Sequence, residues 1–236
     1  MRMKLVSVHL PKTAGTSFGK SLLDRFGDAF LRDYGDRAIS KPEFERHKLA
    51  LLSSIEIANK GLGNVSCIHG HFLPVKYLLL GTLEKLTFIT WMREPVDRMI
   101  SHYNFWQRAY DPATAAPHHR QVIEERWTLE DFCLSPRFRN LYSQYLWAFP
   151  LDNFAFIGIT EHYEDDLAYF GDHVLGVRLR TERLNTAEIK TSPPRVDAAL
   201  RRRIEKFHEA DCCLYRRALE LRQARCSEAP PDNYGA

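Results

Sequence analysis

The segment from residue 9 to residue 18 joins a lysine to small and hydroxyl-bearing residues, at the point where an apolar stretch ends. Gly15 permits close approach of the backbone, Thr16 and Ser17 offer hydroxyl donors, and Lys12 carries a positive charge. A strand that turns into a helix also directs backbone N–H groups and the positive helix end at one point. The pattern predicts a site for an anionic group. Its candidate residues are Lys12, Thr13, Ala14, Gly15, Thr16 and Ser17.

This segment also fits a capped helix start without any ligand, because Thr and Ser are common in that position. It is not a Walker A loop. The pattern G-x-x-x-x-G-K-[ST] is absent, and Lys12 precedes Gly15 instead of following a glycine.

A second candidate for anion binding follows the apolar stretch 85–92. Arg93 stands where that stretch ends, and Pro95 is suited to open a helix. Ser101 lies about two helical turns further on, where its hydroxyl can share an anion with Arg93. Arginine binds phosphate oxygens through two parallel N–H bonds. A surface ion pair would explain Arg93 alone, but two such segments at two strand ends favour one shared anion site.

Apolar and β-branched stretches predict the strands that position these residues. We expect strands at 4–10, 85–92 and 154–160, with a shorter one at 65–69. Continuous apolar character, without strict alternation, is typical of a parallel sheet covered on both faces. Helical spacing of apolar residues predicts helices at 16–30, 95–110, 141–149, 165–175 and 196–222.

Strands that alternate with helices favour the α/β class, with three layers and a central parallel sheet. Residues 108–140 lack a clear period and predict loops and short helices, of the kind that shape a substrate cleft. We expect residues 1–225 to form one domain and residues 226–236 a flexible tail.

Composition excludes several classes of protein. The chain has 236 residues, of which 44% are hydrophobic and 27% charged, as in ordinary globular proteins. A net charge of +3 excludes a polybasic, histone-like binder. Residues 178–225 nevertheless hold 13 Lys and Arg against 7 Asp and Glu. This basic segment is either a surface for an anionic partner or a solvated helix face.

Cysteine usage and hydropathy predict the compartment. The five cysteines are odd in number, form no C-x-x-C pair, and include the adjacent Cys212 and Cys213. A reduced, cytoplasmic location is therefore favoured over secretion. No apolar run approaches the ~20 residues of a membrane span, and the N-terminal apolar stretch is too short for a signal peptide. We expect a soluble protein without a membrane span.

The two anion-binding segments together resemble motifs of the sulfotransferases that use 3′-phosphoadenylyl sulfate (PAPS). Pro11-Lys-Thr-Ala-Gly-Thr-Ser17 resembles their 5′-phosphosulfate loop, and Arg93-Glu-Pro-x-x-Arg-x-x-Ser101 resembles their 3′-phosphate motif. Ile68-His-Gly-His-Phe72 is similar to the catalytic strand end of the heparan/uronyl 2-O-sulfotransferase branch. Residues 156–167 also match a segment of this family. The resemblance spans roughly residues 4–190 and is closest to a soluble, bacterial-type member without the membrane anchor of the animal enzymes.

The resemblance implies a P-loop-NTPase-like sulfotransferase fold and transfer of a sulfuryl group from PAPS to an acceptor hydroxyl on a carbohydrate. The product would be PAP (adenosine 3′,5′-bisphosphate), and no metal would be required. Lys12 is expected at the bridging oxygen, and Arg93 with Ser101 at the 3′-phosphate. The general base is expected to be His71, with His69 as second candidate, since residues two apart in a strand face the same side. Lys190 and Thr191 are loosely matched candidates for donor binding.

Acceptor binding is the least readable part of the site. Arg98, His102, Trp106 and Arg108 are the candidates, because arginine and tryptophan together suit an acidic sugar. The same residues also suit a structural role. Two other functions remain as alternatives. A small-molecule kinase would need Mg²⁺ ligands and a Walker lysine, and neither is in place. A non-catalytic module could bind anionic polysaccharide or nucleic acid through residues 178–225. We favour the sulfotransferase, with no nucleic-acid partner.

Overall fold

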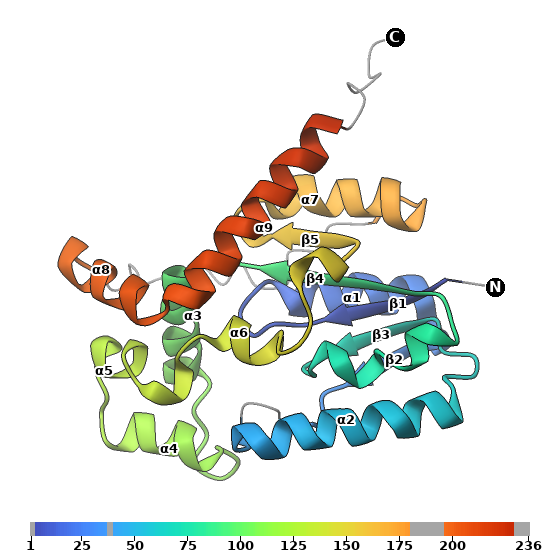
Figure 1. The fold of residues 1–236 in the computed structure, drawn as a ribbon. Coiled ribbons are helices and arrows are strands. Elements are labelled where there is room, and N and C mark those ends of the chain that lie inside the picture. The colour runs from blue at the N-terminus through green and yellow to red at the C-terminus, as the bar shows by residue number, and fades with distance from the viewer. Residues whose placement is uncertain (1–2, 37–39, 180–195, 229–236) are drawn as a thin grey trace.

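The computed structural model describes residues 3–36, 40–179 and 196–228. Five parallel strands form one sheet in the order β2-β3-β1-β4-β5 (Figure 1). Their bounds are β1 Lys4–Val8, β2 Phe30–Asp33, β3 Cys67–Gly70, β4 Leu86–Met92 and β5 Phe156–Ile159. The chain builds β2 and β3 on one side of β1, then crosses to β4 and β5 on the other. Sheets of this kind bind ligands beyond the carboxyl ends of the strands, where the order reverses.

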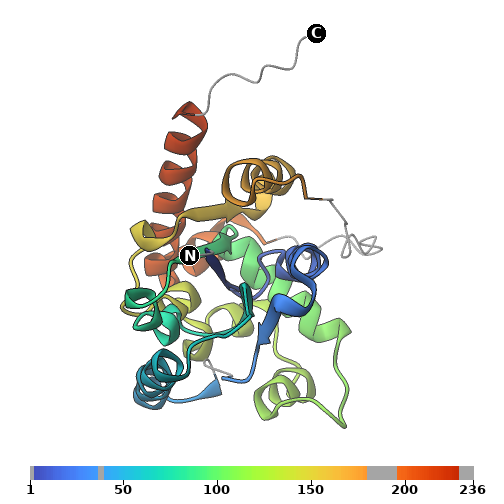
Figure 2. The ribbon, with the colours of Figure 1, turned by 90° about the vertical axis from the view of Figure 1, so that its right-hand side faces the viewer.

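Helices cover both faces of the sheet, which confirms the predicted three-layer α/β architecture (Figures 1 and 2). Helices α1 and α7 pack on one face, where Phe18 and Leu22 meet Leu5 of β1. Helices α2, α6 and α9 pack on the other face, around Val6 and Ile68. The bounds are α1 Gly15–Phe26, α2 Glu43–Lys60, α6 Leu141–Tyr145, α7 Tyr163–Tyr169 and α9 Glu209–Glu228.

Four further helices form a lobe beside the carboxyl edge of the sheet (Figure 1). They are α3 Pro95–Arg108, α4 Pro117–Glu124, α5 Leu129–Cys133 and α8 Ala198–Phe207. This helical lobe has its own core around Trp106 and Phe132. Single 3₁₀ turns connect the elements at Gly27–Ala29, Pro74–Tyr77, Leu80–Thr82, Pro136–Phe138, Leu151–Asn153 and Thr160–His162, and a π-helix follows α7 at Phe170–Leu175.

The structure corrects several predicted boundaries. The helix expected at 16–30 ends at Phe26, because Gly27 adopts a positive φ of 51°, and the chain then forms the unpredicted edge strand β2. The helix expected at 196–222 is two helices. Between them, the buried His208 ring contacts the carbonyl of Cys133 at 2.8 Å and the N–H of Asn140 at 3.1 Å. Tertiary hydrogen bonds thus break a pattern that is continuous in the sequence.

Helix α2 has no counterpart among the predicted elements, since apolar residues such as Phe44 and Ile55 face outward on it. Helix α9 continues to Glu228, into the segment expected to be a tail, and residues 229–236 lie outside the described part of the chain. None of the described helices combines the length and apolar character of a membrane span.

Ion pairs bind α8 and α9, the described helices of the basic segment 178–225, to the rest of the molecule. Arg201 on α8 contacts Glu94 at 2.8 Å and Asp97 at 3.1 Å. Arg222 and Arg225 on α9 both contact the buried Asp166 at 2.9 Å. These positive charges therefore hold α8 and α9 in place, which weakens the interpretation of these two helices as a surface for an anionic partner.

Arg98 belongs to the interior, which corrects its assignment to acceptor binding. Its side chain is fully buried in α3, with the guanidinium carbon 5.4 Å from the centre of the Tyr142 ring. Asp211 on α9 lies nearby and accepts hydrogen bonds from the N–H groups of Tyr142 and Ser143, at 3.0 and 3.1 Å. Burial raises the pKa of Asp211, and the attraction of Arg98 opposes that rise. The two residues join α3, α6 and α9.

Replacing Asp211 tests this junction. Asp211→Asn removes the charge opposite the buried Arg98 and weakens the acceptor for two backbone N–H groups. We expect the free energy of unfolding, measured by urea denaturation, to fall by about 2–4 kcal/mol. Asp152→Asn is the control, because Asp152 pairs with Arg217 on the exposed surface. Its loss should stay below about 1 kcal/mol. Equal losses in the two variants would contradict the structural role of Asp211.

Candidate functional site

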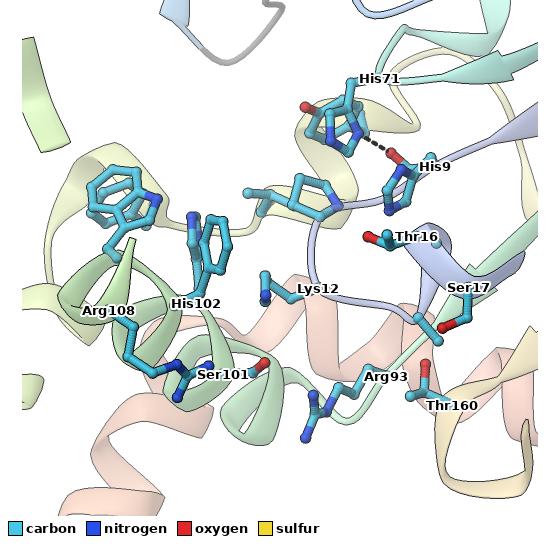
Figure 3. Close-up of a pocket in the computed structure, with 18 of the residues that line it drawn as sticks. His9, Lys12, Thr16, Ser17, His71, Arg93, Ser101, His102, Arg108 and Thr160 are labelled. Atoms are coloured by element: carbon cyan, nitrogen blue, oxygen red, sulfur yellow. Dashed lines mark hydrogen bonds between the residues drawn. The ribbon is translucent and has the colours of Figure 1, made fainter. Parts of the chain in front are cut away.

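A cavity of about 670 Å³ opens where β1, β3, β4 and β5 end (Figure 3). The loop after β1 and the start of α1 form one wall, and α3 forms the wall opposite. His71 follows β3, Arg93 follows β4 and Thr160 follows β5. The predicted convergence of strand ends is therefore present. The volume is in the range of sites for small molecules and cofactors.

The lining of this cavity is positively charged. Lys12, Arg93 and Arg108 contribute to it, whereas Asp and Glu are absent from the lining formed by the described residues. The guanidinium of Arg93 makes neither a hydrogen bond nor an ion pair within the described part of the chain. Cations gathered without carboxylates favour an anionic ligand.

The loop after β1 has an unusual backbone. Lys12 and Ala14 adopt positive φ angles of 70° and 61°, which cost energy for residues with a Cβ atom. Helix α1 begins directly after Ala14, so its first N–H groups lie beside the cavity without acceptors in the helix itself. Thr16 and Ser17 line the cavity as predicted. Thr13 does not, because it is buried and its hydroxyl donates to the carbonyl of Leu10 at 2.8 Å.

Lys12 projects into the middle of the cavity (Figure 3). Its Nζ lies 4.0 Å from the centre of the Phe105 ring. Burial, together with the positive charges of Arg108 and Arg93, lowers the pKa of Lys12 to about 8. An anion bound here would stabilise the charged form of Lys12 and raise its pKa again.

Arg93, Ser101 and Arg108 all line the cavity, and in the view of Figure 3 Ser101 lies between the two arginines. The backbone of Arg93 is fixed by Tyr142 of α6. Its N–H donates to the Tyr142 hydroxyl at 3.0 Å, and its carbonyl accepts from that hydroxyl at 2.6 Å. Both residues thus line one cavity, and a shared anion between them stays a prediction.

His71 lines the cavity and is held as one tautomer. Its Nδ1 lies in a very short hydrogen bond with the carbonyl of His9 (Figure 3). Because a carbonyl only accepts, Nδ1 carries the proton, and the neutral ring keeps a lone pair on Nε2. Burial lowers the pKa of His71, so the ring is neutral at pH 7. These are the properties of a general base.

His69 does not line the cavity, so the expectation that both rings face one cleft is wrong. His69 is a residue of β3, and its ring is buried beneath α1, with Nδ1 2.9 Å from the Ser7 hydroxyl. His71 lies beyond Gly70, the last residue of the strand, where the alternation of a strand no longer determines direction.

His9 also lines the cavity, although it is not among the site residues predicted from the sequence. Its ring lines the cavity and lies 4.3 Å from the His71 ring and 5.0 Å from the His69 ring, between centres. Its Nδ1 is 2.8 Å from the Tyr34 hydroxyl. Burial and the charges of His71, His69 and Lys12 hold the pKa of His9 well below its ordinary value. Its position directly before the Lys12 loop is the sequence feature that points to a place in the site.

Three of the four residues predicted to bind the acceptor lie at the cavity, and one does not. His102 and Trp106 line the cavity, and Arg108 lies at its exposed rim, whereas Arg98 is buried elsewhere. Lys190 and Thr191 lie outside the described residues. Within the described ranges, groups of three or more His, Cys, Asp or Glu arranged to hold a metal ion are absent.

Neither protein-family models nor curated proteins match the chain. Among solved structures, it is similar to a sulfotransferase from Alicyclobacillus acidocaldarius, with 16% identity and a TM-score of 0.46, over 91% of this chain and 94% of that one. It is also similar to mouse sulfotransferase SULT7A1 complexed with PAP, with 14% identity and a TM-score of 0.41, over 87% of this chain and 63% of that one. At such low identity, the chemistry of the cavity has to be inferred from its own residues.

Gly15 and His9 provide a test of the geometry. A Cβ at Gly15 would lie 1.9 Å from Nε2 of His9, so the two side chains cannot coexist in this arrangement. We expect Gly15→Ala to lower the free energy of unfolding by about 1–3 kcal/mol. The double variant His9→Ala/Gly15→Ala should lose much less than the sum of the two single changes.

Gly35→Ala is the control for this cycle, since a Cβ at Gly35 would have no heavy atom of the described residues within 4 Å. It should leave the free energy of unfolding nearly unchanged. Additive losses for His9 and Gly15 would show that the ring does not occupy the place described.

Proposed function

We propose that the protein transfers a sulfuryl group from PAPS to the hydroxyl of an acceptor. The observation that carries this proposal is the pairing of two cationic anion sites in one cavity whose described lining holds no carboxylate. One comprises Lys12 and the start of α1, and the other comprises Arg93 and Ser101. PAPS carries two separate anionic groups, a 5′-phosphosulfate and a 3′-phosphate, and so matches two such sites at once.

The 5′-phosphosulfate would bind the loop from Lys12 to Ser17, through backbone N–H groups and the hydroxyls of Thr16 and Ser17. In the reaction, the acceptor oxygen forms a bond to sulfur while the bond from sulfur to the bridging phosphate oxygen breaks. Negative charge then develops on the leaving phosphate. Lys12 would stabilise that charge at the bridging oxygen, an electrostatic role as in phosphoryl transfer.

Arg93 and Ser101 would hold the 3′-phosphate, which distinguishes PAPS from ATP and ADP. The backbone of Arg93 is positioned by Tyr142, and its guanidinium, which has no hydrogen-bond partner among the described residues, would make a bidentate contact. Lys190 and Thr191 remain predicted contacts of the donor from the sequence resemblance.

His71 would accept the proton of the acceptor hydroxyl on Nε2, since the contact to the His9 carbonyl keeps the other nitrogen protonated. His69 is less suited, because its ring lies beneath α1 and outside the cavity lining. A carbohydrate acceptor stays a prediction from the sequence resemblance. The decisive assay is transfer of radiolabelled sulfate from PAPS to a panel of glycans, lipids, phenols and small alcohols, and the absence of transfer to every member would argue against the proposal.

Nucleotide binding tests the 3′-phosphate site. We expect PAP at about 100 times its Kd to raise Tm by about 5–10 °C. ADP lacks the 3′-phosphate and should give a much smaller shift at the same concentration. Arg93→Ala should remove the difference between the two nucleotides, whereas the control Arg203→Ala, an exposed partner of Glu130, should keep it. Equal shifts with PAP and ADP in the unmodified protein would contradict this assignment.

The pH dependence of kcat/KM tests Lys12 and His71, because it reports groups of the free enzyme. Lys12 is charged below its pKa of about 8, so kcat/KM should fall as the pH rises above about 8. His71 loses its base form only below its lowered pKa, so the acid limb should lie below pH 6.5. Lys12→Arg should shift the alkaline limb upward, since arginine does not titrate in this range.

Alanine substitutions distinguish His71 from His69 as the general base. His71→Ala should lower kcat by about 10²- to 10⁴-fold while PAP binding persists. An unchanged kcat in His71→Ala, with the loss appearing in His69→Ala instead, would assign the base to His69.

A further inference from the structure

Helix α2 and the two turns beside it expose many large apolar side chains. Within the described ranges, most of the exposed large apolar residues lie in this one region. They are Phe44, Leu49, Leu51, Leu52, Ile55, Leu78, Leu79 and Leu83, and we call them the α2 patch. The turns at Pro74–Tyr77 and Leu80–Thr82 pack against α2, and the N–H of Leu79 donates to the Ser54 hydroxyl at 3.2 Å. The two parts of the patch therefore adjoin each other.

The patch lies on the side of α2 that is turned away from the sheet. Ala50 and Ser54 are buried on the inner side of the helix. Leu52 lies two residues from each of them, so its side chain points about 160° away around the helix. Figure 1 shows α2 at the lower edge of the molecule, with the sheet on its other side. Leu52 thus stands near the middle of the outer surface of α2.

The α2 patch has the size of a protein interface. Phe44 is 81% exposed and Leu83 62%, and the other six residues are between 40% and 53% exposed. Together these residues expose roughly 800 Å², about the share of one partner in a standard protein–protein interface. The largest apolar patch of a monomeric protein typically covers only about 300–600 Å². The size of the patch therefore favours a macromolecular partner.

The charges of α2 discriminate between kinds of partner. The helix holds three acidic and three basic residues, so its formal net charge is zero. Helices that bind an anionic membrane surface instead have a polar face rich in Lys and Arg. Charges of both signs around an apolar centre suit a protein surface that carries the same charges in reverse order.

A second copy of α2 has its charges in that order. When two α2 helices pack antiparallel across a two-fold axis at Leu52, residues equally far from Leu52 on either side face each other. Lys48 and Glu56 are both exposed, and each lies four residues from Leu52, about 6 Å along the helix. Lys48 of each copy thus faces Glu56 of the other. The dipoles of antiparallel helices also attract each other.

We propose that the α2 patch joins two copies of this chain into a two-fold symmetric dimer, with the α2 helices antiparallel and Leu52 at the axis. The apolar residues supply the buried area, and the pairs of Lys48 with Glu56 determine direction and register. Residues of α2 and of the patch are absent from the described lining of the cavity. The inference is therefore independent of the proposed function.

Sedimentation equilibrium tests the dimer. At micromolar concentration, the unmodified protein should show twice the 27.5 kDa mass of the chain. Leu52→Glu brings two carboxylates together at the axis and should give the monomer at the same concentration. Ala199→Glu is the control, because it adds the same charge at an exposed position of α8, in the helical lobe, and it should stay dimeric. A monomeric unmodified protein, or a dimer that persists in Leu52→Glu, would overturn the inference.

Charge exchange tests the register. Lys48→Glu brings two carboxylates together across the interface, and Glu56→Lys brings two ammonium groups together. Each change alone should raise the Kd of the dimer by about tenfold, since like charges then meet twice. The double variant Lys48→Glu/Glu56→Lys should restore the original Kd. Arg203→Glu, on the exposed surface of α8, is the control and should leave it unchanged. A double variant as weak as the single ones would overturn the antiparallel arrangement.

Oxidative cross-linking locates the axis and needs no loss of association. Leu52→Cys should form a disulfide between two copies, because a side chain on a two-fold axis meets its own counterpart. The unmodified protein is the control, since its exposed Cys213 and Cys226 lie on α9, and it should give much less cross-linked dimer. Equal cross-linking in both proteins would overturn the placement of the axis. A monomer in solution that co-sediments with phosphatidylserine vesicles would assign the patch to a membrane surface and overturn the dimer.

Discussion

Repulsion between positive charges at the carboxyl edge of the sheet is the constraint on which the structure depends. Lys12, Arg93 and Arg108 share one cavity without a carboxylate among its described walls, and burial, together with the charges of Arg108 and Arg93, lowers the pKa of Lys12 to about 8. Such an arrangement is unfavourable in the empty protein and becomes favourable when an anion binds. The surrounding fold therefore has to hold the cations in place without neutralising them.

Several contacts achieve this by binding backbone or apolar parts of the cationic residues. Tyr142 hydrogen bonds to both backbone groups of Arg93, and Phe105 supports the ammonium of Lys12. Tyr142 is positioned in turn by Asp211, which lies near the buried Arg98. Asp211 lies outside the cavity lining, where it orders the scaffold, and Lys12, Arg93 and Arg108 line the cavity.

Three histidines at the ends of the neighbouring strands β1 and β3 serve structure and chemistry together. His69 is sealed beneath α1, His9 fills the space that Gly15 leaves open, and His71 reaches the cavity. Burial keeps all three rings neutral near pH 7, so they add no charge to the cationic site. The positive φ angles of Lys12 and Ala14 show that the loop itself is strained, as is common where a backbone is shaped around a ligand.

The sequence by itself determined the α/β class, the central strands, and the convergence of Lys12, Arg93 and Ser101. Apolar runs specify parallel strands, and residues placed directly after such strands must meet at one sheet edge. Only the tertiary structure decided which candidates reach the cavity. Arg98 and His69 have suitable residue types, but both side chains are buried. Arg98 on α3 faces the interior near Asp211 of α9, and His69 on β3 is covered by α1. The aromatic part of the cavity lining likewise required the fold, since its rings come from α3, α4, α6 and the 3₁₀ turn at Pro136–Phe138, with no shared sequence pattern.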